Sequence, residues 1–126
     1  MIRRPISTET MRQLYPPPTP EGGPAVDSLG RKWIALHTAA VAIAALAGDA
    51  ANDLADVDGV LARLALMPAA GRRRIDDHFS DLIAVMEPGL AALLSIRRRH
   101  GDASASARAL LREFRRARAM IELMLG

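Results

Sequence analysis

The sequence has no cysteine and few aromatic residues. The absence of cysteine excludes disulfides, thiolate nucleophiles and thiolate metal ligands from the chemistry of this chain. Aromatic residues make up 3% of the 126 residues, whereas hydrophobic residues make up 50%, so aliphatic side chains must fill the interior. Because many of these side chains are small, we expect helices that pack closely.

The motifs of common catalytic sites are also missing. The chain has no nucleophile elbow, no phosphate-binding glycine loop and no zinc-protease motif. The stretch from Gly101 to Ser104 lies at a predicted helix junction and lacks the pattern of a phosphate loop. We therefore predict that the protein is not an enzyme and has no catalytic residue, no cofactor and no bound metal.

Neither a secretory signal nor a transmembrane segment is expected. Residues 1–7 include two arginines and a serine, and no apolar run follows them directly. The apolar run at residues 34–47 is shorter than the roughly 20 residues that span a bilayer. We interpret it as a buried helix of a cytoplasmic protein. A helix that is apolar on nearly every side must be covered on every side, by the rest of the bundle or by a second subunit.

The formal net charge of +3 is distributed unevenly. Residues 1–32 carry +2, residues 33–96 carry −4 and residues 97–126 carry +5. All basic residues except Lys32 are arginines, a bias that we attribute to a GC-rich genome rather than to phosphate recognition. The basic character is thus concentrated near the C-terminal end.

Apolar residues recur three and four positions apart along most of the chain, which is the spacing of one helix face. The clearest stripes are Leu29, Trp33, Leu36, Ala40, Ile43 and Ala47; Leu54, Val57, Leu61 and Leu64; and Ala107, Leu110, Phe114, Ala117, Ile121 and Met124. A further helix is expected through residues 75–94. Pro88 predicts a kink or a break within it.

Local signals indicate where the first helices begin and end. Asp27 or Ser28 is expected to cap the first helix, which runs to about residue 49 or beyond. Gly48 either ends this helix or only weakens it. The sequence leaves open whether this helix and residues 53–67 form one bent helix or two.

Glycine and charged residues indicate where the third expected helix ends and where the last one begins. The helix that begins after Gly71 is expected to end at residues 97–101, where arginines face the negative helix end and Gly101 supplies the turn. The cap of the last helix is expected to be Asp102, Ser104 or Ser106.

The N-terminal segment, residues 1–26, is rich in proline. Residues 15–20 read Tyr-Pro-Pro-Pro-Thr-Pro and predict a polyproline II stretch, while residues 7–14 suit a short helix. This arm is expected to be either a flexible tail or a segment that docks on the bundle or on a partner. Its apolar residues are Ile6, Met11, Leu14 and Tyr15.

These patterns together predict an all-α fold in one domain. We expect a small antiparallel helical bundle of three to five helices at residues 27–126, preceded by an irregular proline-rich arm at residues 1–26. The first helix is expected to be the central element.

The tightest polar cluster consists of Asp76, Asp77, His78 and Asp81. A metal or acid–base site using Asp77, His78 and Asp81 is one hypothesis. However, bundle metal sites of the di-iron kind repeat a Glu-x-x-His pair on two helices, and this chain has no such pair. We therefore predict a solvated first helical turn.

Two other polar features receive structural interpretations. His37 is isolated within an apolar helix, so we interpret it as a hydrogen-bonded core residue and not as a ligand. The stripe formed by Asp49, Asp53 and Asp56 is expected to be a solvated face or a docking patch for arginines.

The last helix carries arginines at positions that mostly avoid its apolar stripe: Arg108, Arg112, Arg115, Arg116 and Arg118. These side chains have two possible roles: they contact phosphates, or they pair with the acidic middle of the chain. No helix-turn-helix, zinc-finger or RNA-binding signature accompanies them, so we favour a solvated or protein-contacting face. The candidate anion or nucleic-acid contacts are Arg97, Arg98, Arg99, Arg108, Arg112, Arg115 and Arg116.

The sequence therefore favours a non-catalytic protein–protein interaction module, such as an adaptor, a regulator or an accessory subunit. We expect a homo-oligomer or a subunit of a larger complex, because large exposed apolar surfaces usually mark interfaces. The candidate partner-binding residues are Leu14, Tyr15, Pro17 and Trp33. The alternative is a small nucleic-acid-binding regulator that uses the arginine-rich C-terminal helix.

Overall fold

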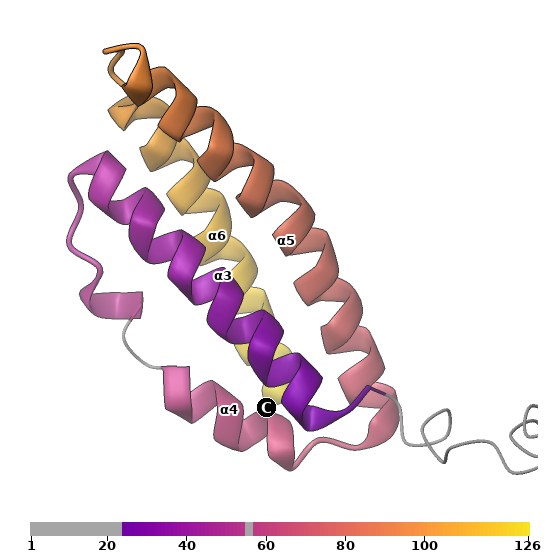
Figure 1. Cartoon of the computed structure of the whole chain (residues 1–126). Coiled ribbons are helices and arrows are strands. Elements are labelled where there is room, and N and C mark those ends of the chain that lie inside the picture. The colour runs from indigo at the N-terminus through magenta and orange to yellow at the C-terminus, as the bar shows by residue number, and fades with distance from the viewer. Residues whose placement is uncertain (1–23, 55–56) are drawn as a thin grey trace, which may run out of the picture.

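The computed structural model describes residues 24–54 and 57–126, and all of the regular structure in these ranges is helical (Figure 1). The α-helices are α3 (Val26–Ala47), α4 (Val57–Ala65), α5 (Ala69–Arg98) and α6 (Ser104–Leu125), and the short 3-10 helix η1 spans Asn52–Leu54. The all-α helical bundle is therefore confirmed. The predicted arm lies almost entirely outside the described residues.

Successive α-helices alternate in direction, so the bundle is antiparallel as predicted (Figure 1). The helices α3 and α5 run the same way, and α4 and α6 run the opposite way. The three long helices α3, α5 and α6 pack on one another, and the short α4 packs against α3 and α6. Because α3 contacts every other helix, it is the central element, as the sequence predicts.

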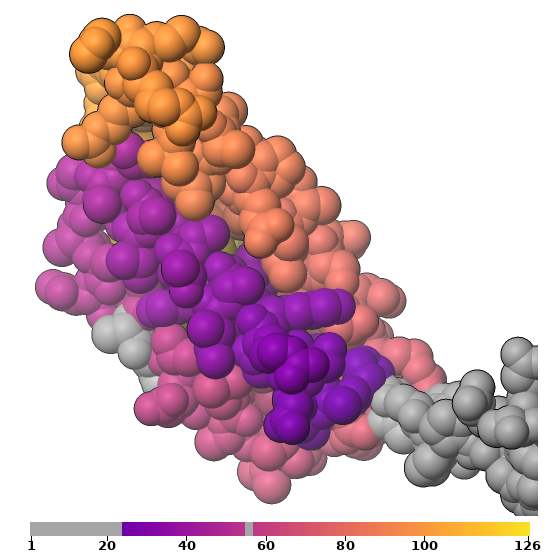
Figure 2. Space-filling view, in the orientation of Figure 1, coloured from indigo at the N-terminus to yellow at the C-terminus, as the bar shows by residue number. Residues whose placement is uncertain are grey.

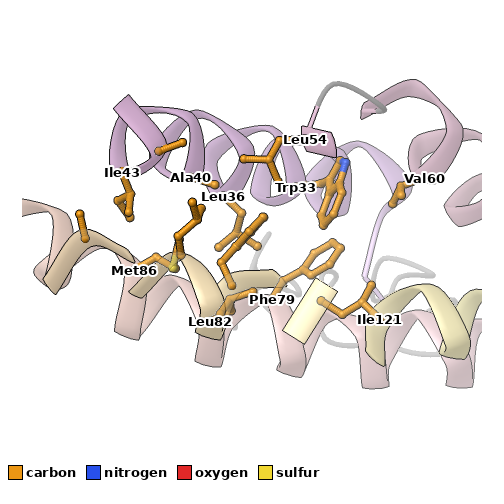
Figure 3. Packing of buried hydrophobic residues seen from close by; sticks show 14 of the residues in the cluster. Trp33, Leu36, Ala40, Ile43, Leu54, Val60, Phe79, Leu82, Met86 and Ile121 are labelled. Carbon is orange, nitrogen blue, oxygen red and sulfur yellow. The ribbon is translucent and has the colours of Figure 1, made fainter. Parts of the chain in front are cut away.

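A continuous apolar core joins the helices (Figure 3). The rings of Trp33 on α3 and Phe79 on α5 stack with their centroids 5.6 Å apart and their planes at 26°. Such an aromatic pair contributes about 0.5–1.5 kcal/mol beyond the area it buries. All six residues of the stripe predicted on α3 are buried: Leu29, Trp33, Leu36, Ala40, Ile43 and Ala47.

Gly48 ends α3 and so separates it from α4. Its backbone φ of 71° is left-handed, a conformation that costs glycine little. The N–H of Gly48 donates to the carbonyl of Ala45 at 3.2 Å, and the N–H of Asp49 donates to the carbonyl of Ala44 at 2.9 Å. These two bonds form a Schellman motif, which satisfies the last carbonyls of the helix. The sequence left open one helix or two, and there are two.

The predicted cap of α3 is wrong, and so are those predicted for α6, whose N-cap position is Ala103 and has no side-chain cap hydrogen bond. Helix α3 begins at Val26 with Ala25 at the N-cap position and no side-chain hydrogen bond there, and Asp27 lies inside the first turn. A carboxylate in that turn is still favourable because the helix dipole is positive there. At α6, the Asp102 carboxylate accepts a hydrogen bond from the Ser104 N–H at 2.9 Å, which lowers the pKa of Asp102.

Pro88 does not break α5, which runs without interruption from Ala69 to Arg98. Proline has no N–H, so the carbonyl of Ala84 loses its intrahelical partner. Both Ala84 and Pro88 lie on the exposed side of the helix, where water can hydrogen-bond that carbonyl. The exposed position explains why a break expected from sequence does not occur.

The turn after α5 uses a different residue from the one expected. His100, not Gly101, has the left-handed backbone, with a φ of 62°. The N–H of Gly101 donates to the carbonyl of Ile96 at 2.9 Å. A Cβ at position 101 would lie 2.8 Å from the Cγ2 of Ile96, so the glycine is needed for this close approach.

Candidate functional site

The outer face of α3 is uncharged over most of its length. Between Lys32 and Asp49 the chain has no Asp, Glu, Lys or Arg. Ile34 and Val41 are 49% and 41% exposed on this face. The Thr38 hydroxyl donates to the carbonyl of Ile34 at 2.9 Å, so it is already satisfied within the helix. The face therefore offers mainly apolar surface to its surroundings.

This face continues into a groove between α3 and α5 (Figure 2). The groove has a volume of about 470 Å³. Helix α3 contributes mostly alanines and α5 contributes larger apolar side chains, of which Leu94 is 40% exposed. The groove is lined by Ala35, Thr38, Ala39, Ala42, Glu87, Leu90, Ala91 and Leu94.

Local sequence explains why the groove is open. The α3 side chains that face it are small, so they leave space beside the larger Leu90 and Leu94 of α5. Helix α6 packs against both α3 and α5, but it lies behind them in the view of Figure 1. Within residues 24–54 and 57–126, no further helix covers the front of this pair.

Glu87 is the single charged residue in the lining of this groove. A carboxylate at the edge of an apolar groove favours an occupant with a cation at the matching position. The groove therefore combines apolar contact with one electrostatic preference.

Helices α3 and α5 are also the two described helices that are long and apolar enough to cross a membrane by length and composition. The core helix of a folded bundle satisfies the same criterion, and in α3 eight residues are buried against the other helices. This finding assigns no location to the protein.

The structure places Trp33 differently from its predicted partner-binding role. Its side chain is 0% exposed and packs in the core between Phe79 and Arg118. A partner docking on this fold has no access to it. The signal that indicates the exposed face is the second stripe on the same helix, Ile34, Thr38, Val41 and Ala45, which is spaced like the core stripe but lies opposite to it. Leu14, Tyr15 and Pro17 lie outside the described residues.

Arg115 pairs with the acidic stripe near the end of α3. Its guanidinium contacts the Asp53 carboxylate at 2.6 Å and the Asp49 carboxylate at 3.0 Å. The hydrogen bonds raise the pKa of Arg115 and lower that of Asp53. The prediction that this stripe docks arginines is confirmed for Asp49 and Asp53, and Asp56 lies outside the described residues.

Arg118 lies in the core and not on a solvated face. It is only 8% exposed, and its guanidinium carbon lies 5.9 Å from the centroid of the Trp33 ring, a cation–π contact. One guanidinium nitrogen donates to the backbone carbonyl of Asp53. The Nε atom lies 3.5 Å from the Glu122 carboxylate, an ion pair. Grouping Arg118 with the surface arginines from sequence was wrong, because its spacing from Phe114 and Ile121 places it on the inner face.

The other candidate anion contacts differ in which groups of the same chain they contact. Arg116 pairs with Glu113 at 2.8 Å. Arg108 reaches the carbonyl of Ala47 at 3.5 Å, and Arg99 donates to the Ser95 hydroxyl at 3.1 Å. Arg97, Arg98, Arg99 and His100 are exposed at the C-terminal end of α5, and Arg108 and Arg112 are exposed in the first turns of α6.

The cluster predicted as a weak metal candidate is not assembled into a site. Asp76 pairs with the Lys32 ammonium at 2.6 Å, and Asp77, His78 and Asp81 are exposed. Among the residues that the structure describes, no group of three or more potential metal ligands comes together.

His37 is half-buried on α3, and its Nδ1 atom has no hydrogen-bond partner. Burial lowers the pKa of His37, and the positive charge of Arg118 lowers it further. The neutral imidazole is therefore the form that suits this position, but the interpretation as a hydrogen-bonded core residue is not confirmed, because Nδ1 has no partner and the side chain is only partly buried.

In comparisons with known proteins, the chain matches no protein-family model, no curated protein and no solved structure.

Proposed function

We propose that this protein is a non-catalytic interaction module whose docking surface is the outer face of α3 together with the α3–α5 groove. The observation that carries the proposal is the exposure of an uncharged helix face beside an apolar groove. Exposed apolar surfaces of this kind are typical of binding sites.

The apolar residues of the groove, such as Leu94, and of the outer face of α3, Ile34 and Val41, provide the driving force. Burying a Val, Leu or Ile side chain completely contributes about 1.5–3 kcal/mol. Ile34, Val41 and Leu94 are 40–49% exposed, so covering each of them contributes about half of that. A partner that also contacts the alanines gains a close approach, because their side chains are short.

The shape of the site favours an amphipathic helix as the partner element. A helix binds in a groove between two helices through apolar residues three, four and seven positions apart. Such a helix fits antiparallel between α3 and α5, as neighbouring helices in this bundle alternate in direction. A lysine or arginine beside its apolar stripe would pair with Glu87.

Two matched variants test the proposal. Ala91→Arg places a long charged side chain in the groove, whereas Ala92→Arg makes the same change on the same helix at an exposed position outside the groove lining. The measurement is the mass of the complex that purifies with the tagged full chain from the cells that make it. We expect the complex to be lost in Ala91→Arg and retained in Ala92→Arg. Equal retention in both variants would reject the groove as the docking surface.

Nucleic-acid binding is the second candidate, supported by the exposed arginines at the α5–α6 end. Arg97, Arg98, Arg99 and Arg112 are exposed there, whereas Arg115 and Arg116 are paired with acids. Titration with duplex DNA at several salt concentrations tests this candidate, because each neutralised phosphate adds to the salt dependence. No binding at low salt would reject it.

A further inference from the structure

We propose that residues 6–15 of this same chain dock in the α3–α5 groove and so compete with the partner. This inference rests on the groove described under the proposed function. If residues 6–15 occupy the groove, a partner binds only when they leave it. Three observations support it: where the N-terminal segment joins the bundle, how many residues it has and what chemistry its sequence carries; the direction that a docked segment would take agrees with the bundle.

The N-terminal segment joins the bundle at the edge that holds the groove. The guanidinium of Arg72, in the first turn of α5, donates to the backbone carbonyl of Pro24 at 3.0 Å and to that of Met67 at 2.7 Å. The chain preceding α3 is therefore tied to the start of α5, and it enters α3 beside the line along which α3 and α5 meet.

The length of the segment matches the distance to the groove. The middle of the groove, near Thr38, lies about 20 Å along α3 from Pro24, at a rise of about 1.5 Å per residue. Residues 16–23 separate Pro24 from Tyr15, and at a polyproline II rise of about 3.1 Å per residue they span about 25 Å. The proline-rich stretch is thus a spacer of the required length.

Chain direction supports the same placement. A segment that leads from the groove back to Pro24 runs antiparallel to α3 and α5, continuing the alternation seen in α3, α4, α5 and α6. It would lie in front of the two parallel helices, on the side opposite α6.

The chemistry of residues 6–15 fits the lining of the groove. Met11 and Leu14 have the spacing of one face of the short helix predicted at residues 7–14, and Ile6 and Tyr15 add apolar side chains at its two ends. Arg12 lies next to that face and can pair with Glu87, the acid in the lining. A second copy of the chain fits less well, because a two-fold axis through the groove would bring two copies of Glu87 toward each other.

Tethering makes this contact effective even if it is weak. A segment joined by a short spacer has an effective concentration on the order of millimolar at its own groove. A partner must displace this segment. The partner's apparent affinity is therefore its intrinsic affinity multiplied by the fraction of grooves that are free.

The absence of cysteine allows a direct test on the full chain. Gln13→Cys, placed opposite the predicted apolar face of the segment, carries a single spin label, and NMR measures the broadening of methyl signals. We expect loss of signal from Ala35, Ala42, Ala91 and Leu94, and no loss from Ala109 on the exposed side of α6. Adding Ala91→Arg should restore the signals of Ala35, Ala42 and Leu94, whereas Ala92→Arg should not.

A mixing experiment separates contacts within one chain from contacts between chains. Spin-labelled chains without isotopes are mixed with isotope-labelled chains without the spin label. Broadening in the doubly labelled chain alone supports docking within one chain. Broadening in the mixture to the same extent would overturn it in favour of exchange between copies, and no broadening in either sample would overturn it altogether.

The two proposals fail in distinguishable ways. If the purified complex is lost in Ala91→Arg but the spin label leaves the groove signals unchanged, the interaction module stands and the internal competitor is rejected. If the spin label broadens those signals but no complex depends on Ala91, the groove belongs to its own N-terminal segment and the partner is rejected.

Discussion

The two helices α3 and α6 have the same length, 22 residues, and both bury one face in the same core, yet their outer faces differ in charge. That of α6 is charged over much of its length and exposes the apolar Met120 and Leu123 near its end, at 55% and 82%. The exposed side of α6 carries Arg112, Glu113 and Arg116. The exposed side of α3 carries Ile34, Thr38 and Val41. Core packing cannot account for the α3 residues, because the buried stripe lies on the other side of that helix.

The difference between these outer faces indicates that the face of α6 is suited to contact with water and that the face of α3 is suited to contact with a partner. A charged outer face keeps α6 hydrated and directs Arg115 toward the acids that follow α3. An apolar outer face on α3 gains free energy only when another surface covers it. We therefore place the docking surface on α3 and α5, and interpret α6 as a structural helix.

The strongest expected effect comes from a comparison of the two faces of α3, in which the same substitution, isoleucine to alanine, is made on each face. Ile43 is 0% exposed and Ile34 is 49% exposed. Ile43→Ala should lower the free energy of unfolding by about 2–5 kcal/mol, because it leaves a cavity in the core. Ile34→Ala should change it by no more than about 0.5 kcal/mol. Urea unfolding followed by Trp33 fluorescence measures both. Similar losses in the two variants would mean that the outer face is covered within the folded monomer.

The next effect contrasts two arginines of α6. Arg118→Ala removes the contact with Trp33 and the hydrogen bond to the Asp53 carbonyl, and should cost about 1–3 kcal/mol. Arg112→Ala, at an exposed position, should stay within about 0.5 kcal/mol. Thermal unfolding of both variants provides the comparison. If Arg118→Ala left the free energy of unfolding unchanged, the cost of desolvating the guanidinium would equal the stabilisation that its contacts provide.

A smaller effect is expected from the pair that joins α6 to the end of α3. Arg115→Ala should cost about 0.2–1 kcal/mol, because both partners are partly exposed, and less at high salt. The pKa of Asp53 is lowered by Arg115, so the stabilisation is present above the ordinary carboxylate range and is lost as the pH falls through the lowered pKa. A double-mutant cycle with Asp53→Asn measures the coupling, and a coupling of zero would reject the pair.

The smallest effect concerns His37 and pH. Burial and Arg118 lower its pKa below the ordinary value of 6.5, so the unfolded chain binds a proton before the folded chain does. Stability should therefore be complete above that value and decline as the pH falls toward the lowered pKa. His37→Gln should remove this dependence below about pH 6.5, whereas His78→Gln, at an exposed position, should retain it. Urea unfolding at several pH values measures the difference.

Much of the fold follows from spacing alone. The apolar stripe on α3 predicted the residues that face the core, and Gly48 was recognised as a possible end of the helix. The acidic stripe was predicted as a docking patch for arginines, and Arg115 occupies it.

The remaining features depend on tertiary contacts that spacing does not encode. Pro88 suggested a kink or a break, but the helix continues without a break where the freed carbonyl faces water. Arg118 was grouped with the surface arginines because of its charge, although its spacing from Phe114 and Ile121 indicates the inner face; only its cation–π contact with Trp33 depends on tertiary structure. The groove could not be predicted, because it depends on which alanines of α3 lie beside Leu90 and Leu94 of α5.

Site-specific photo-crosslinking tests the central claim most directly. A photoreactive amino acid is placed at position 91, inside the groove, or at position 92, outside it, and the full chain is irradiated in the cells that make it. We predict covalent adducts, to another protein or to the N-terminal segment of the same chain, from position 91 and few from position 92. Equal yields from the two positions, or none from position 91, would contradict the claim that the groove is occupied.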